Sequence, residues 1–267
     1  MSIYNMRGNT INNYYDANGM LKTSLYDVNG ALITYDSNAF ADSTTVTTVY
    51  TSTYSSHPVP EGGCIDDDGN VYVCYYQGAF LKYNLESGTE TEFSFTSGAY
   101  GHANGMTYNP NTGYLYLAAM KNTGEVYVFD TSLNLVDTLY AKDANNTVFN
   151  CWNIAYDRIA ERFITLTNGT IYFFDDNFNL IKTASYNISD WTETRQDIET
   201  DGYYIYCVSH NQPYIYVFGM DGTHIKSITN SAFSGEPESL MYDWSNDVFY
   251  MEGMNNGWVI RRTEFRS

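Results

Sequence analysis

The chain has 267 residues, enough for one all-β domain or two smaller domains. Its net charge of −18, from 13 basic and 31 acidic residues, would repel nucleic-acid phosphates and anionic membrane surfaces. We therefore expect no nucleic-acid partner, and no apolar run is long enough to predict membrane insertion. The 27 Tyr and 14 Phe residues, set between Asn-, Asp- and Gly-rich breaks, favour β-strands over helices.

The first 43 residues differ in character from the rest of the chain. Two similar segments, Tyr15–Gly19 and Tyr26–Gly30, start 11 residues apart and predict short hairpin strands. Such strands bury too little surface to be stable alone. We expect residues 1–43 to form an attachment or oligomerisation segment. The alternative is a simple cover over the rest of the chain. The N-terminus carries no apolar signal-peptide core, so we expect synthesis in a cytoplasm without secretion.

Residues 44–267 are predicted to form one domain built from a repeat. The domain opens with a β-rich segment, Thr45–Tyr54, that has no obvious partner nearby in the sequence. A strand ending in an aromatic residue then recurs at Leu81–Tyr83, Tyr127–Phe129, Tyr172–Phe174 and Tyr216–Phe218. The final aromatic residues of these strands are 46, 45 and 44 residues apart.

Each aromatic strand follows an alternating apolar run and precedes a further strand, with turn dipeptides such as Asp68-Gly69 between them. Four short strands every 42 to 48 residues are typical of a β-propeller blade. The five inner strands are expected to begin near Gly62, Asn104, Trp152, Gln196 and Glu238. The fifth unit has three strands, so we predict that Thr45–Tyr54 completes it and removes an exposed edge. The predicted fold class is all-β: a five-bladed β-propeller closed by an N-terminal strand.

Two further features bear on metals and cofactors. The four cysteines Cys64, Cys74, Cys151 and Cys207 form no CxxC pair, so we expect buried thiols and no zinc site. The segment Asp66–Asn70 superficially resembles a calcium loop, but it lacks a Glu at the required offset and is better explained as a hairpin. We predict neither a metal nor a cofactor.

The start of each inner strand is the predicted ligand site, because these positions surround one mouth of a propeller's channel. The candidate ligand-binding residues are His102, Asn104, Trp152, Gln196, Glu236 and Glu238. Amides, carboxylates and a histidine offer hydrogen bonds to sugar hydroxyls, and an indole offers a stacking face. The alternative is that these side chains only hydrate the channel and satisfy backbone groups.

Catalysis is a separate question. A glycoside hydrolase needs two carboxylates on opposite sides of the bound sugar. Glu236, Glu238, Asp197 and Glu199 are candidates, but no hydrolase motif distinguishes them. We therefore predict no catalytic residues and no enzyme activity, and a glycoside hydrolase-type propeller stays an alternative.

The segment Gly101–Leu117 resembles a strand-turn-strand in β-propeller domains of phage tail, baseplate and receptor-binding proteins of Gram-positive hosts. The strand starts Arg195–Glu199 and Glu236–Leu240 are similar to other blades of such domains. The resemblance implies a structural protein of the virion tail that binds a host cell-surface glycan. Residues 1–43 would then contact other tail or baseplate proteins and support a homo-oligomer. The high negative charge departs from this pattern, because anionic wall polymers would be repelled. A lectin-like bacterial propeller that binds carbohydrate or protein is the alternative.

Overall fold

The computed structural model divides the chain into two compact units, Met1–Ala39 and Phe40–Ser267. The structure describes residues 3–4, 10–11, 14–15, 21–22, 25–26, 32–33, 37–51, 59–76, 79–94, 100–120, 124–167, 169–188, 195–210, 212–230, 237–254 and 258–266. In this part of the chain, no helix is long and apolar enough to cross a membrane.

The first unit consists of short paired strands, as the sequence predicts. The pairs are β1 (Ile3–Tyr4) with β2 (Thr10–Ile11), β3 (Tyr14–Tyr15) with β4 (Leu21–Lys22), and β5 (Leu25–Tyr26) with β6 (Leu32–Ile33). The residues between paired strands lie outside the described part of the chain. A single turn of 3-10 helix, Ser37–Ala39, ends the unit.

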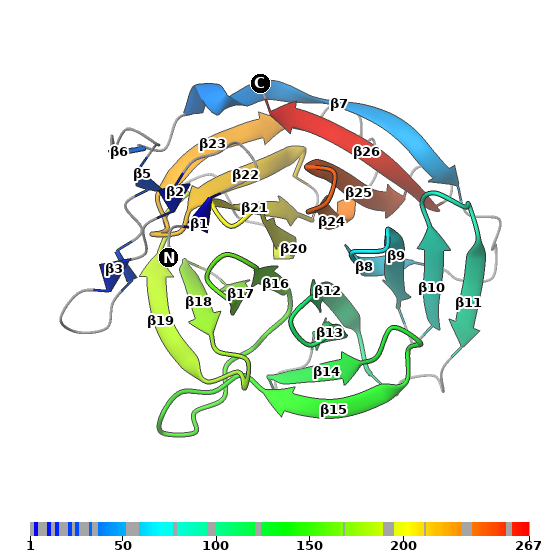
Figure 1. The fold of residues 1–267 in the computed structure, drawn as a ribbon, viewed down its shortest axis with the longest axis horizontal. Coiled ribbons are helices and arrows are strands. Elements are labelled where there is room, and N and C mark those ends of the chain that lie inside the picture. Colours follow the sequence, from blue (N-terminus) through cyan, green and yellow to red (C-terminus); the bar gives the residue numbers. More distant parts are fainter. Residues whose placement is uncertain are drawn as a thin grey trace. The chain divides into compact units, whose positions relative to one another are not determined.

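The second unit is a ring of five four-stranded antiparallel blades, which confirms the predicted fold (Figure 1). Blade one holds β8 (Pro60–Ile65), β9 (Asn70–Tyr75), β10 (Ala79–Asn84) and β11 (Glu90–Ser94). Blade two holds β12 (Ala103–Asn109), β13 (Tyr114–Ala119), β14 (Glu125–Phe129) and β15 (Leu135–Tyr140). Blade three holds β16 (Ala155–Asp157), β17 (Arg162–Thr167), β18 (Thr170–Phe174) and β19 (Leu180–Ser185).

Blades four and five share one continuous sheet. Blade four holds β20 (Arg195–Thr200), β21 (Tyr204–Ser209), β22 (Tyr214–Gly219) and β23 (His224–Thr229). Blade five holds β24 (Pro237–Asp243), β25 (Val248–Met254) and β26 (Trp258–Arg266), with β7 (Phe40–Thr51) as its outermost strand. The inner strands β8, β12, β16, β20 and β24 therefore surround the centre of the ring (Figure 1).

Strand β7 closes the ring as predicted, although it begins at Phe40 rather than Thr45. It runs antiparallel to β26, where Val46 pairs with Thr263, and it meets β23 of blade four at one parallel bridge. An ion pair of 2.8 Å between Lys226 and Asp42 adds to that junction. At the other side, the Tyr50 hydroxyl donates to Glu90 of blade one at 2.7 Å. Strand β7 thus completes blade five and also contacts blades four and one.

An Asp or Asn at the end of each inner strand, or directly after it, shapes the following turn. Asp66, Asn109, Asp157, Asp201 and Asp243 each accept a backbone N–H from two or three residues further on. These bonds lie at 2.8–3.1 Å and stabilise the turn by giving its donors a local acceptor. The hairpin predicted at Asp66–Asn70 is one of them. Four of these five turn residues are acidic, so part of the acidic composition serves to shape turns.

The core lies between blades and is rich in aromatic residues. Tyr116 and Phe163, from blades two and three, pack with ring centroids 4.5 Å apart. The four cysteines are buried as free thiols, as predicted. Burial raises the pKa of the Cys151 thiol to about 12, so this sulfur behaves as a small apolar group.

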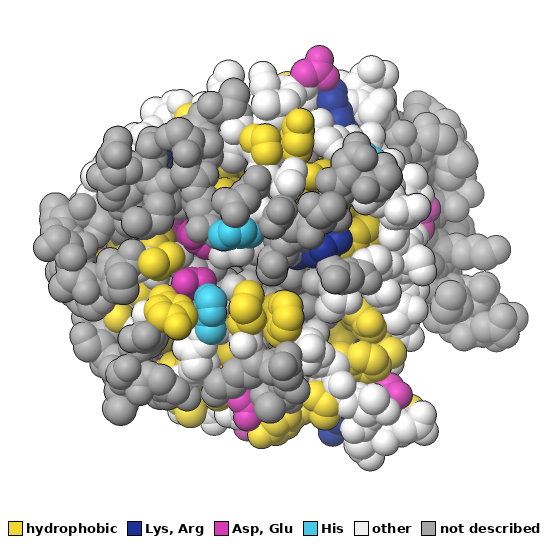
Figure 2. Space-filling view, turned by 180° about the vertical axis from the view of Figure 1, so that it is seen from behind, with side chains coloured by type: hydrophobic (Ala, Val, Ile, Leu, Met, Phe, Trp, Pro, Cys, Tyr) yellow, Lys and Arg dark blue, Asp and Glu magenta, His cyan; other side chains and the backbone are white. Residues whose placement is uncertain are grey.

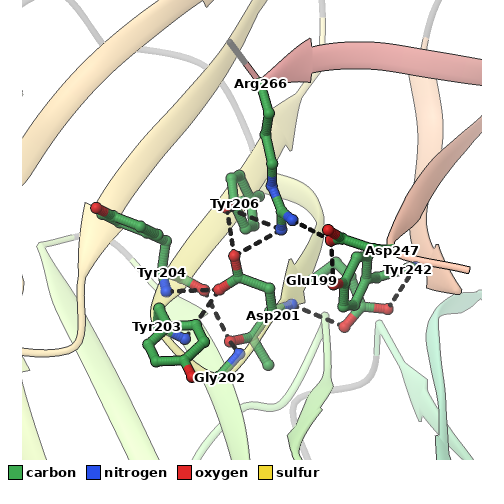
Figure 3. Close-up of polar contacts among 10 residues, drawn as sticks. Glu199, Asp201, Gly202, Tyr203, Tyr204, Tyr206, Tyr242, Asp247 and Arg266 are labelled. Atoms are coloured by element: carbon green, nitrogen blue, oxygen red, sulfur yellow. Dashed lines mark hydrogen bonds and ion pairs between the residues drawn. The ribbon is translucent and has the colours of Figure 1, made fainter. Parts of the chain in front are cut away.

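Strand β26 is fixed to blade four by a half-buried arginine, Arg266 (Figure 3). Arg266 Nη2 lies 2.6 Å from Asp201 Oδ2, which also accepts a bond from the Tyr206 hydroxyl at 2.8 Å. Arg266 pairs with Asp247 as well, and Asp247 accepts from the Tyr242 hydroxyl at 2.6 Å. One side chain therefore joins turns of blades four and five.

Candidate functional site

A β-bulge interrupts the start of four inner strands at the same repeat position. In the pairing of each inner strand with its neighbour, the register skips one residue, namely Glu61, Asn104, Gln196 and Glu238. Each of these residues lies five positions before the Asp or Asn of the turn. A bulged residue leaves the ladder and its side chain is re-aimed, which is why bulges recur beside binding sites. Trp152 occupies this position in blade three, ahead of β16.

The equivalent residue in blade one is Glu61, which corrects the predicted Gly62. An ideal Cβ on Gly62 would lie 2.0 Å from the Asn104 carbonyl oxygen, so the inner strands of blades one and two approach closely there. Apolar alternation cannot locate Glu61, because a bulge adds a residue without changing the pattern on either side. Counting back from the turn residue Asp66 would have found it.

Three of the four bulged residues, Glu61, Gln196 and Glu238, border a pocket of about 230 Å³. Its lining residues are Val59, Glu61, His102, Met120, Gln196, His210 and Glu238. Figure 2 shows histidine and acidic side chains gathered near the middle of this face, with hydrophobic side chains around them. The structure thus brings together His102, Gln196 and Glu238 of the predicted site. Asn104 and Trp152 are not among the lining residues, and Glu236 lies outside the described residues.

Asn104 instead ties inner strands together. Its side chain is 0% exposed, and its Nδ2 donates to the carbonyl oxygens of Trp152 at 2.6 Å and Gln196 at 2.7 Å. It therefore connects blade two to blades three and four. Trp152 is half-buried, and its indole Nε1 has no hydrogen-bond partner among the described residues.

Glu61 and His102 form the first polar pair of the pocket. Glu61 is 5% exposed, and its Oε2 lies 2.6 Å from Nε2 of His102, whose side chain is 34% exposed. The Tyr76 ring meets the imidazole edge-on with centroids 4.8 Å apart. The carboxylate and the ring together fix how the imidazole is oriented toward the pocket.

Glu238 and Gln196 form the second pair. Glu238 is 1% exposed, and the Gln196 side-chain amide donates to its Oε2. Burial and, after it, the negative charge of Glu61 raise the pKa of Glu238 to about 9 against the lowering effect of the hydrogen bond from Gln196. At neutral pH the Glu238 carboxyl is therefore protonated, and it can donate as well as accept a hydrogen bond.

Two carboxyl groups of β20 that the sequence marks as hydrolase candidates lie outside the pocket lining. Asp197 is buried and accepts the Leu240 N–H at 3.4 Å. Glu199 accepts the N–H groups of Thr200 at 2.7 Å and Tyr242 at 3.2 Å. Burial raises the pKa of Glu199 to about 8 and that of Asp197 well above its ordinary value. Both hold blades four and five together by binding backbone donors.

The lining chemistry restricts what the pocket can hold. Neither Lys nor Arg is among the described lining residues, so a phosphate or carboxylate group would meet negative charge without a compensating cation. No group of three or more His, Cys, Asp and Glu among the described residues is placed to hold a metal ion. The geometry fits an uncharged or cationic organic ligand.

Comparison with known proteins supports the fold. No family model matches the sequence, and no curated protein matches it. Glutaminyl cyclase from Myxococcus xanthus superposes with a TM-score of 0.66 at 13% identity, covering 85% of this chain and 98% of the cyclase. A streptogramin B lyase superposes with a TM-score of 0.53 at 9% identity, covering 84% of this chain and 98% of the lyase. At such low identities the likeness extends to the fold alone. These neighbours are enzymes by name, and they lend no support to the resemblance to phage tail proteins. By its fold, the chain is a β-propeller.

Proposed function

We propose that the pocket at the channel mouth binds one sugar unit of a carbohydrate ligand. The observation that carries this proposal is the shared bulge, which places Glu61, Gln196 and Glu238 from three different blades around one pocket. A volume of about 230 Å³ suits one hexose-sized unit more closely than a larger drug-sized ligand.

The lining matches the chemistry of a sugar ring. Hydroxyl groups both donate and accept, and the pocket offers acceptors on Glu61 and Gln196 and a protonated carboxyl on Glu238. Val59 and Met120 supply apolar surface for the C–H face of the ring. Because Glu238 and Gln196 are almost fully buried, hydrogen bonds to them form away from competing water.

The wider role in this proposal is host attachment by a phage tail protein, with a free lectin-like propeller as the alternative. It rests on the sequence of Gly101–Leu117. The N-terminal unit would join the propeller to other tail proteins and to further copies of the chain. Removing residues 1–39 is expected to leave a folded monomer, with oligomers seen by light scattering only for the full chain. If both proteins have the same oligomeric state, this role is contradicted.

An acid–base enzyme is a second candidate. The observation that favours it is the protonated Glu238 near Glu61, whose partner His102 could take up a proton. A proton donor and an acceptor around one pocket are the requirements of general acid–base catalysis. The structural neighbours named as a cyclase and a lyase show that similar propellers carry enzymes.

Sugar binding is tested with an array of mono- and oligosaccharides and by titration of the best binder into the protein. Gln196→Ala should weaken binding about tenfold, because it removes an amide that bonds the ligand and positions Glu238. Asn145→Ala, at an exposed loop position, is the matched control and should bind like wild type. If no sugar binds, or if the two variants bind alike, the pocket is not a sugar site. Mass spectrometry of the incubated ligands separates binding from turnover.

A further inference from the structure

The pocket combines two neighbouring carboxyl groups with a set of unused acceptor atoms. Glu61 Oε2 contacts His102, and Glu238 Oε2 accepts from Gln196. No described residue donates a hydrogen bond to the second oxygen of either carboxyl or to the Gln196 side-chain oxygen. All three side chains line the pocket and are less than 7% exposed. These acceptor atoms belong to side chains that line the pocket, so a ligand there can supply their donors.

The charge of the pocket points to the kind of donor. Glu61 is close enough for its negative charge to raise the pKa of Glu238, and Glu252 contributes in the same direction. Among the described lining residues, His102 and His210 are the side chains that can become positive, and Lys and Arg are absent. A neutral ligand would leave Glu238 protonated beside the Glu61 carboxylate. A cationic group between the two carboxyls would instead stabilise both as carboxylates.

A primary ammonium group has the matching form. It carries three N–H donors in a compact head, and the pocket offers three acceptor oxygens from Glu61, Gln196 and Glu238. A metal ion would compete for the same oxygens, but the described residues provide no metal-binding group of three or more ligands. The net charge of −18 would also concentrate cations around the protein.

We propose that the ligand carries a protonated primary amine, as an amino sugar does, and that its ammonium group lies between Glu61 and Glu238. The proposal rests on the proposed sugar-binding function and narrows it to one class of sugar. Binding has a defined proton balance. The ligand enters as R–NH₃⁺, Glu238 changes from carboxylic acid to carboxylate, and its proton passes to the buffer.

The test is calorimetric titration of the full chain with three methyl glycosides: glucosamine, N-acetylglucosamine and glucose. Titrations run at about pH 6.5, where a free amine is protonated, in two buffers that differ in heat of ionisation. We expect glucosaminide to bind at least about tenfold more tightly than the other two, as a charge-assisted bond implies. The binding enthalpy of the glucosaminide should differ between the two buffers. The difference should correspond to the release of about one proton per site.

Two variants test whether Glu238 is the source of the amine preference and of the released proton. Glu238→Gln keeps the shape and the amide-facing oxygen but has no proton to release, so glucosaminide affinity should fall about tenfold or more and the buffer dependence should vanish. Glu86→Gln, the same change at an exposed turn, should alter neither. If the neutral sugars bind equally well without proton release, the amine proposal is wrong while sugar binding stands. If none of the three binds, both proposals fail.

Discussion

The Asp197 carboxyl is placed where an ionised group is unfavourable. It is fully buried, its Oδ2 accepts the Leu240 N–H, and its Oδ1 has no hydrogen-bond partner among the described residues. Burial raises its pKa well above the ordinary value, with a contribution from the charge of Glu199. The folded protein therefore holds this proton to a higher pH than the unfolded chain does. The difference weakens the fold above the unfolded pKa.

Asp197→Asn should consequently stabilise the protein at neutral pH. Asparagine has the same shape as aspartate, and its side-chain oxygen can accept the Leu240 N–H in place of Oδ2. Its NH₂ group then occupies the position of Oδ1, which accepts no hydrogen bond from the described residues. We expect the melting temperature at about pH 7 to rise by about 2 °C or more. The gain should disappear below about pH 3.5, where Asp is protonated in both states. Asp137→Asn, on the exposed strand β15, is the control and should change little. A gain that persists unchanged in acid would refute the explanation.

Asn104 tests whether a predicted site residue binds ligand or supports the ring. Asn104→Ala leaves two buried carbonyl oxygens without their donor, at a cost of about 2–4 kcal/mol. The melting temperature should fall by about 5–10 °C. Sugar affinity, measured well below that temperature, should change less than threefold, because Asn104 is not among the pocket-lining residues. A large loss of affinity with unchanged melting would instead make Asn104 a ligand contact.

At the scale of strands, the repeat was visible because each blade has the same alternation and turn chemistry. The strand pairing of β7 with β26 also followed, since blade five was one strand short. The bulges were not visible, and for that reason the blade-one position was assigned to Gly62, one residue after Glu61. In blade three, β16 starts at Ala155 rather than near Trp152, because the preceding residues form a loop that composition alone does not mark. Long-range contacts such as Tyr50 with Glu90 carry no local signal.

The role of strand β7 in closing the ring can be tested with two N-terminal truncations. A variant lacking residues 1–39 retains all of β7, whereas one lacking residues 1–54 removes it. The first should melt as cooperatively as the full chain. The second exposes the edges of β26 and β23 and loses the contact between blades five and one, so it should aggregate or melt far lower. Thermal melting followed by circular dichroism compares them. Equal melting of the two variants would show that β7 is dispensable for closure.

At the scale of the whole molecule, two groups of acidic residues respond to pH in opposite ways. Turn residues such as Asp130 accept N–H groups and side-chain donors, which lower the pKa of Asp130, so their contribution is lost as pH falls. The buried carboxyls of Asp157, Asp197, Glu199 and Glu238 behave in the reverse way. Their folded pKa values are raised, so their favourable contribution is complete in acid and is lost as pH rises. Stability should therefore be greatest at mildly acidic pH.

The alkaline side of this dependence can be assigned to particular groups. Glu199 has a pKa of about 8 and Glu238 of about 9, so stability should decline from about pH 5 and level off above about pH 9. We expect a melting temperature at least about 5 °C lower at pH 9 than at pH 6. If the decline came instead from surface repulsion by the charge of −18, salt would abolish it. The reason is that about 1 M salt screens exposed charges but not buried ones. The decline should persist in salt, and Glu238→Gln should melt higher than wild type at pH 9 and equally at pH 4. If salt abolishes the decline and this variant follows wild type, exposed charges control alkaline stability and the buried carboxyls do not.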